Sequence, residues 1–280
     1  MKKRALDIAV ISDVNLGHEL CHTNELKAYL SSINPKKLVL NGDFIYDASR
    51  SFHRFSSIEL SIIRKLIDMA ANGTEIIYIT GDKDVLSKKL SRLNLSNFTF
   101  KRDAVLDLDG KKAWFLHGDT LFPYNQLNKW LYQFGSWGFG LTRFINQFKQ
   151  KIKSGLIDIS EEFQSFNSKL NNRFENAMLR LAIDKGYAYV ICGHIHQPKK
   201  ELLETHKGKC TYLNSGDWIT HLTALEYTFK RWKIYNYSRD KLSPFFADED
   251  LKKLDANDLS SLIARSSSLT IGKKLKALVF

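Results

Sequence analysis

The stretch DIAVISDVNLGHE, residues 7–19, decides how the rest of the chain is interpreted. Its apolar, β-favouring run from Ile8 to Ile11 predicts a buried strand, which ends abruptly at Ser12 and Asp13, with Asn15 close behind. Turn residues usually follow a buried strand, so Asp13 could simply end one. It could also be the first ligand of a metal site at the end of a sheet, and both interpretations stay open here.

The composition is that of a globular protein with an unusual charge. With 280 residues, 44% hydrophobic and 26% charged, the chain can form one large domain with an inserted or appended subdomain. The net charge of +12 favours an anionic partner, such as nucleic acid, an anionic membrane surface or a phosphorylated substrate. The alternative is a basic but otherwise ordinary soluble protein. Because no recognised nucleic-acid-binding motif accompanies the charge, we expect no nucleic-acid partner.

The cysteines and the N-terminus indicate a cytoplasmic protein. Three cysteines without metal-type spacing imply no disulfide framework and favour a reducing compartment. The opening MKKRALDIAVISD resembles a signal peptide, but its apolar part is short, includes Asp7 and lacks a cleavage pattern. The sequence contains no stretch of about 18 uncharged apolar residues, so we expect no membrane-spanning segment.

Strand and helix patterns alternate over the first 120 residues, which predicts a parallel sheet covered by helices. The segment NFTFKRDAVLDLDGKKAWFLHGD then predicts strands joined at Asp109-Gly110, and three later segments predict closing antiparallel strands. The expected strands are 6–12, 37–41, 75–80, 187–192, 209–218, 222–229 and 231–237, and the expected helices are 24–33 and 56–71, the second capped by Asn72-Gly73.

We expect one domain over residues 1–240 that contains a helical cap insertion over 121–185. The insertion is rich in aromatic residues, and residues 129–155 combine them with lysine and arginine. Such a segment suits an amphiphilic substrate or an anionic membrane surface, and it equally suits a helical pair packed on the sheet. Residues 241–280 form a polar tail with a weak helical pattern, which we expect to be loosely attached.

Polar residues follow the predicted strands at four points, and a fifth strand leads into GDKD, with Asp82, Lys83 and Asp84. Because loops beyond the carboxyl ends of parallel strands converge in one crevice, we expect these side chains to meet. Two aspartates and three histidines form a strong ligand set for divalent transition metals, although each motif alone is weak. The five are Asp13, Asp43 in NGD, His117 in HGD, and His194 and His196 in GHIH.

In this order the segments resemble those of the calcineurin-like metallophosphoesterases. The similarity extends to the UDP-2,3-diacylglucosamine diphosphatase branch of lipid A synthesis and covers about residues 5–237, through ISDVNLG, LVLNGD, YITGDKD, DGKKAWFLHGD, YAYVICGHIHQP and TYLNSGDW. The resemblance implies an α/β fold, a β-sandwich flanked by helices, with the helical cap as an insertion.

The resemblance also implies a centre of two divalent metals, for which we expect manganese. Asp13 and His196 would hold one metal, His117 and His194 the other, and Asp43 would bridge them. Two such metals clamp a phosphoryl group and lower the pKa of a bridging water. In the diphosphatase branch, water attacks the pyrophosphate of a UDP-sugar lipid and releases UMP and a lipid sugar phosphate.

Three positions depart from the family pattern. Asn15 replaces a histidine ligand, and a carboxamide suits manganese or magnesium better than zinc or iron. Asp82 can still bind metal, but Lys83 stands where the family has the histidine that contacts the phosphate. A lysine there can stabilise charge but transfers protons poorly. Tyr46 replaces the last aspartate of Gly-Asp-x-x-Asp, with Asp47 one residue late.

Other polar residues fall near the expected crevice. His18 and His22 could substitute for the missing ligand, or they could be solvent-facing loop residues. His53 and Arg54 fall where the branch keeps residues that bind substrate, and they equally suit the start of a surface helix.

Two hypotheses therefore remain. The first is a divergent metal-dependent hydrolase of a phosphodiester or pyrophosphate bond, which acts on a nucleotide-linked lipid or similar anionic substrate, in the cytoplasm and peripherally on the inner membrane. The second is a catalytically degenerate relative that binds a lipid or a protein partner. The five retained ligands support the first, and Asn15, Tyr46 and Lys83 support the second.

Overall fold

The computed structural model describes residues 3–46, 55–81, 97–119 and 157–240, with side chains from residue 171 onward in the last range. The chain divides into two compact units, one made of residues 1–118 with 179–280, and the other of residues 119–178. All of the strands described below belong to the first unit.

The first sheet carries the parallel core that the alternating pattern predicts. Its strand order is β11-β10-β1-β2-β3-β4, in which β1 to β4 are parallel neighbours and β10 and β11 add an antiparallel hairpin beside β1. The strands are β1 (Arg4–Ile11), β2 (Ile33–Asn41), β3 (Glu75–Ile79), β4 (Phe98–Lys101), β10 (Thr223–Thr228) and β11 (Arg231–Asn236).

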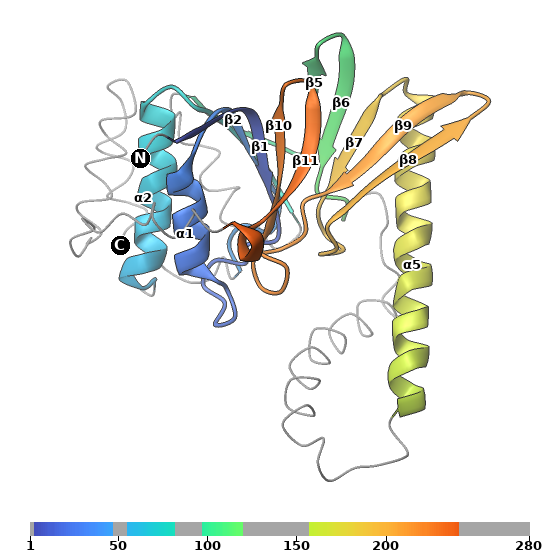
Figure 1. The fold of residues 1–280 in the computed structure, drawn as a ribbon, viewed down its shortest axis with the longest axis horizontal. Helices are drawn as coiled ribbons and strands as arrows, with labels where there is room; N and C mark the ends of the chain where they lie inside the picture. Colours follow the sequence, from blue (N-terminus) through green and yellow to red (C-terminus); the bar gives the residue numbers. More distant parts are fainter. Residues whose placement is uncertain (1–2, 47–54, 82–96, 120–156, 241–280) are drawn as a thin grey trace. The chain divides into compact units, whose positions relative to one another are not determined.

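Two helices cover one face of this sheet, α1 (Thr23–Ser32) and α2 (Ser57–Ala71), which lie side by side in Figure 1. Their apolar residues form one buried cluster with Ala9, Ile11 and Leu40 of the sheet. A capping box starts α2, since Ser56 Oγ accepts the Glu59 N–H and the Glu59 carboxylate accepts the Ser56 N–H. The helix ends at Asn72, as predicted.

The second sheet has the strand order β5-β6-β7-β9-β8. A second buried cluster joins Val10, Val39 and Ile77 of the first sheet to Phe115 and Ile191 of the second. The predicted β-sandwich flanked by helices is therefore confirmed, with successive side chains of β1 facing the helices and the other sheet in turn. The strands are β5 (Asp103–Leu108), β6 (Lys111–Leu116), β7 (Tyr189–Cys192), β8 (Lys199–Thr205) and β9 (Gly208–Asn214).

A 28-residue helix, α5 (Ile157–Asp184), lies within the expected insertion. The aromatic and basic segment at 129–155 lies entirely outside the described residues, and so does the tail at 241–280. Among the helices that the structure describes, none is long and apolar enough to cross a membrane.

The structure differs from the sequence expectations at β8 and at β9, and β2 begins at Ile33 rather than at residue 37. The chain from Lys199 to Thr205 forms β8, which no apolar pattern predicts, because this edge strand is mostly exposed and rich in lysine and glutamate. The segment forms a strand because it pairs with β9. The expectation that β9 closes the fold as an antiparallel strand was half wrong, because β9 is antiparallel to β8 but parallel to β7.

Candidate metal centre

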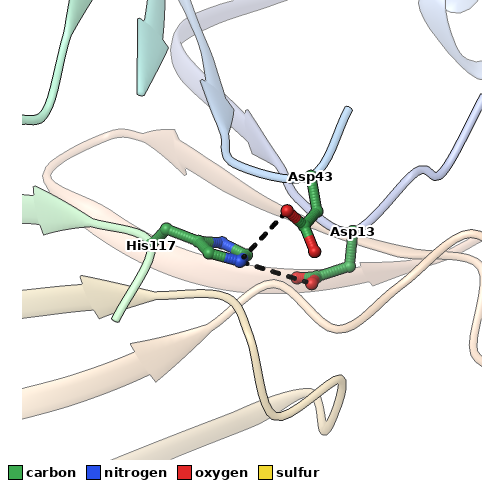
Figure 2. Close-up of side chains that lie close together, drawn as sticks. All are labelled: Asp13, Asp43 and His117. Carbon is green, nitrogen blue, oxygen red and sulfur yellow. Dashed lines mark ion pairs between the residues drawn. The ribbon is translucent and has the colours of Figure 1, made fainter. Parts of the chain in front are cut away.

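Three buried side chains from three strand ends point toward one another. Asp13 follows β1, Asp43 follows β2 and His117 follows β6, so both sheets contribute. One ligand atom of each lies within 4.8 Å of the other two (Figure 2). His117 Nε2 lies 3.7 Å from Asp43 Oδ1 and 4.0 Å from Asp13 Oδ1.

The two histidines of the GHIH loop after β7 approach the same aspartate. His196 Nε2 lies 3.2 Å from Asp13 Oδ1, and the main-chain N–H of His194 donates to Asp13 Oδ2 at 3.0 Å. The His194 ring lies 5.3 Å from the ring of His117, centre to centre. The structure thus brings together all five residues that were predicted from the strand ends.

These loops adopt a backbone conformation that non-glycine residues rarely use. The φ angles of Asp13, Asn15, Asp43, His194 and His196 are 51°, 51°, 48°, 68° and 59°, all in the left-handed region. Each such residue costs on the order of 1 kcal/mol or more, and such strain clusters at functional sites. Main-chain hydrogen bonds hold the first two loops together, with Asp13 N–H donating to Gly42 O and Asn15 N–H to Asp43 O, at 3.1 and 2.9 Å.

Three glycines lie directly against the candidate ligands. A Cβ at Gly42 would collide with the imidazole of His117. A Cβ at Gly81 would lie 2.5 Å from Asp43 Oδ1, and one at Gly193 would lie 2.6 Å from Asp13 Oδ2. The sequence interpretation missed these glycines as site residues. Their signal was the glycine shared by NGD, TGD and CGH.

Two further residues hold the imidazoles, and both were also missed. His117 Nδ1 lies 2.9 Å from the main-chain oxygen of Asn41, whose side chain donates to Leu116 O at 3.1 Å. His196 Nδ1 lies 3.4 Å from Asp217 Oδ2. The signals were the Asn in NGD and the Asp in NSGDW. With each Nδ1 engaged, the Nε2 atoms of His117 and His196 face the carboxylates.

The charges in this cluster depend on one another. Burial opposes the charge of Asp13, but the imidazoles of His196 and His117 outweigh it and lower the pKa of Asp13. Burial likewise opposes the charge of His196, yet Asp13 and Asp217 raise its pKa to about 10. Burial and the neighbouring His117 lower the pKa of His194 to about 4. The pKa of Asp217 is lowered, because hydrogen bonds from His196 and His221 exceed the effect of burial.

This donor set fits a divalent transition metal ion. Two carboxylates and an imidazole converge within a few ångströms, while His196 and His194 lie beside them. Asp13, Asp43 and His117 form a group that could hold a metal ion, with His196 adjacent to Asp13.

The other sequence-predicted residues have different positions. Asn15 is buried beside Asp43, whereas Tyr46 is 41% exposed and packs edge-on against the ring of His18 at 4.5 Å. His18 Nδ1 accepts the Leu20 N–H at 3.1 Å, and His22 lies 3.5 Å from Glu25. The predicted residues Asp82, Lys83, His53 and Arg54 lie outside the described residues.

Two curated proteins and one solved structure illustrate what the chain is similar to. The UDP-2,3-diacylglucosamine hydrolase of Aliivibrio fischeri is 24% identical over 73% of this chain and 86% of its own length. The protein of the same name from Vibrio atlanticus is 26% identical over 63% of this chain and 74% of its own length. A solved archaeal phosphodiesterase aligns over 82% of this chain and 98% of its own, at 17% identity and a TM-score of 0.42.

The family model for calcineurin-like phosphoesterases matches residues 6–198. That range is more than half of the chain and contains Asp13, Asp43, His117, His194 and His196. The enzymes of this family depend on metal ions, in agreement with the carboxylate and imidazole cluster described above. The chain therefore belongs to the calcineurin-like phosphoesterase family.

Proposed function

We propose that this protein is a divergent metal-dependent hydrolase of a phosphoester or pyrophosphate bond, and that its substrate is a lipid-linked nucleotide of the UDP-2,3-diacylglucosamine class. The observation that carries the proposal is the convergence of Asp13, Asp43 and His117 within 4.8 Å. The substrate class is supported by the names of the curated relatives.

Each residue of the cluster has a distinct task in this proposal. Asp43 Oδ1 lies 3.7 Å from His117 Nε2, and in this proposal Asp43 would be shared by two ions, one held by Asp13 and His196 and the other by His117 and His194, as the family resemblance implies. The ions would supply Lewis acidity toward the phosphoryl oxygens and lower the pKa of a water molecule. Gly42 and Gly81 keep the ligands close by leaving room that a Cβ would fill.

Residues beyond the cluster complete the proposed binding of substrate. Lys83 would stabilise the phosphate charge, and Asp82 would add a carboxylate ligand, with His53 and Arg54 toward the substrate. Residues 121–185 would form a cap for the acyl chains. The net charge of +12 supports an anionic substrate and binding at an anionic membrane surface in the cytoplasm.

Asn15 favours a second candidate function, in which the protein binds a lipid or a protein partner without turnover. It is only 3% exposed and its main-chain N–H donates to Asp43 O, and the family resemblance implies a histidine ligand at this position. Since a carboxamide oxygen is a weak donor for zinc and iron but acceptable to manganese, we propose Mn²⁺ as the metal.

The test measures Mn²⁺ content and the hydrolysis of bis(p-nitrophenyl) phosphate and of UDP-2,3-diacylglucosamine by the full chain. We expect metal binding and turnover, both lost in His117→Gln and retained in His206→Gln, which changes an exposed histidine in the β8–β9 turn. If the unsubstituted chain binds metal without turnover, and the double variant Asn15→His with Lys83→His gains turnover, the binding function is favoured. If neither the unsubstituted chain nor the double variant binds metal or hydrolyses a substrate, the enzyme hypothesis is rejected.

A further inference from the structure

The carboxylate of Asp217 lies behind His196 on the side away from Asp13. Asp217 follows β9 and is 2% exposed. Its Oδ2 lies 3.4 Å from His196 Nδ1 and 3.3 Å from His221 Nδ1. On the other side of the His196 ring, Nε2 lies 3.2 Å from Asp13 Oδ1. His196 is thus held between two buried carboxylates, one of which belongs to the candidate metal cluster.

The orientation of this carboxylate does not depend on His196. Asp217 Oδ1 accepts main-chain N–H groups from Ile219, Thr220 and His221 at 3.2, 2.7 and 2.9 Å. Three such bonds satisfy one oxygen and fix the plane of the carboxylate, which leaves Oδ2 directed at the imidazoles. The turn therefore prepares the carboxylate before any metal binds.

The short segment Asn214–Asp217 also contacts the two loops that carry candidate ligands. Ser215 Oγ lies 2.6 Å from Ser12 Oγ, next to Asp13. The Asn214 side chain donates to Gly193 O at 2.8 Å, next to His194. Since all of these groups are buried, a displacement of Asp217 would be resisted from both loops.

We propose that Asp217 is a positioning residue that holds His196 for metal binding. Its Oδ2 accepts a hydrogen bond from His196 Nδ1–H, which leaves the lone pair of Nε2 free to bind an ion beside Asp13. A carboxylate behind a metal-bound histidine fixes both the ring orientation and the tautomer, and it raises the basicity of the ligand. This role rests on the proposed function, because it requires a metal ion at the Asp13 cluster.

The first test is Asp217→Asn. The amide oxygen can still accept the three main-chain N–H groups, but the amide nitrogen is a donor facing His196 Nδ1. That pairing favours the tautomer with the proton on Nε2, where the metal should bind. We expect the affinity of the full chain for Mn²⁺, measured by electron paramagnetic resonance of free Mn²⁺, to fall about 10- to 100-fold.

The matched control is Asp184→Asn, which removes an exposed carboxylate paired with Lys207 at the end of α5 and should leave Mn²⁺ affinity unchanged. Asp217→Glu keeps a carboxylate and should retain more affinity than Asp217→Asn. Thermal melting of the metal-free variants checks that each is folded. Mn²⁺ affinity of a folded Asp217→Asn variant equal to that of the unsubstituted chain would overturn the role of Asp217 and leave the proposed function standing.

A double-mutant cycle separates positioning from a general loss of structure. In a His196→Gln background, Asp217→Asn should cause no further loss of Mn²⁺ affinity, because its effect passes through the imidazole. A loss of the same size in both backgrounds would overturn the role. Absence of Mn²⁺ binding by the unsubstituted chain would reject the proposed function, and this role with it.

Discussion

At the scale of single residues, Asp13 makes the contacts that organise the site. Its Oδ1 faces the imidazoles of His196 and His117, and its Oδ2 accepts the His194 N–H. Its main chain is held in the left-handed region by the bond from its N–H to Gly42 O. A residue that merely ended a strand would need none of these contacts, so the structure favours the interpretation of Asp13 as a metal ligand.

His196 should make the stability of the metal-free protein depend on pH. Its pKa is about 10 in the folded chain against 6.5 in the unfolded chain. The folded state therefore holds the proton more tightly, and this stabilisation is complete below pH 6.5 and lost as the pH rises through about 10. We expect the melting temperature in EDTA to fall over that interval. His196→Gln should flatten the curve, and His206→Gln, at an exposed site, should not. An equally steep fall in all three proteins would contradict this cause.

At the scale of elements, the strands supply the residues and the loops after them supply the geometry. The loops after β1, β2, β6 and β7 contain glycine or left-handed residues, which let the next side chain turn into the site. These glycines matter because they lack a Cβ, and the ligand side chains occupy the space where a Cβ would lie. The loops can therefore approach this closely only where the ligand side chains pack against glycine.

The substitution Gly193→Ala tests whether the close approach of the GHIH loop to Asp13 requires a glycine. The added Cβ would lie 2.6 Å from Asp13 Oδ2 and 2.8 Å from Ser12 Cβ, so the GHIH loop or the Asp13 loop must shift. We expect a loss of about 1–3 kcal/mol in unfolding free energy, measured by urea denaturation, and a weaker Mn²⁺ affinity. Gly110→Ala is the matched control, because its φ of 79° is strained but no atom lies within 4 Å. It should lower stability by about 1 kcal/mol without changing Mn²⁺ affinity. Unchanged Mn²⁺ affinity in Gly193→Ala would contradict the packing argument.

At the scale of the whole molecule, the candidate centre joins the two sheets of the sandwich. Asp13 and Asp43 come from the first sheet, and His117, His194 and His196 come from the second. A bound ion would therefore bond the two sheets to each other through their buried strand ends. Because the ion would bind the folded state and not the unfolded state, it should stabilise both sheets together.

Bound Mn²⁺ should raise the stability of the folded protein. At a free Mn²⁺ concentration of about 100 times its Kd, the folded state gains roughly 2.7 kcal/mol. We expect the melting temperature to rise by about 5 °C or more over that in EDTA. Asp43→Asn should abolish the rise, because it removes one of the two carboxylates of the cluster. Asp184→Asn, which changes an exposed carboxylate, should keep the rise. Differential scanning calorimetry measures both variants, and a full rise in Asp43→Asn would show that the ion binds elsewhere.

The sequence by itself determined the elements whose signals are local. The apolar runs before Asp13 and Asp43 predicted β1 and β2, and the helical spacing and Asn72-Gly73 predicted α2 and its end. The turn at Asp109-Gly110, with φ angles of 55° and 79°, was also predicted from its own residues. The five polar residues at the strand ends were found in the same way, since each follows its strand directly in the chain.

Only the tertiary structure decided the features that depend on distant neighbours. β8 has no apolar pattern of its own and forms because β9 offers a partner edge. The glycines against the ligands, and Asp217 behind His196, act on residues that lie far away in the sequence or across a loop. A sequence pattern reports a residue's own preference, whereas the distance between an imidazole and a carboxylate is set by how two sheets pack together. For this reason the candidate ligands could be predicted from the sequence, whereas the contacts made by the glycines and by Asp217 became visible only in the folded structure.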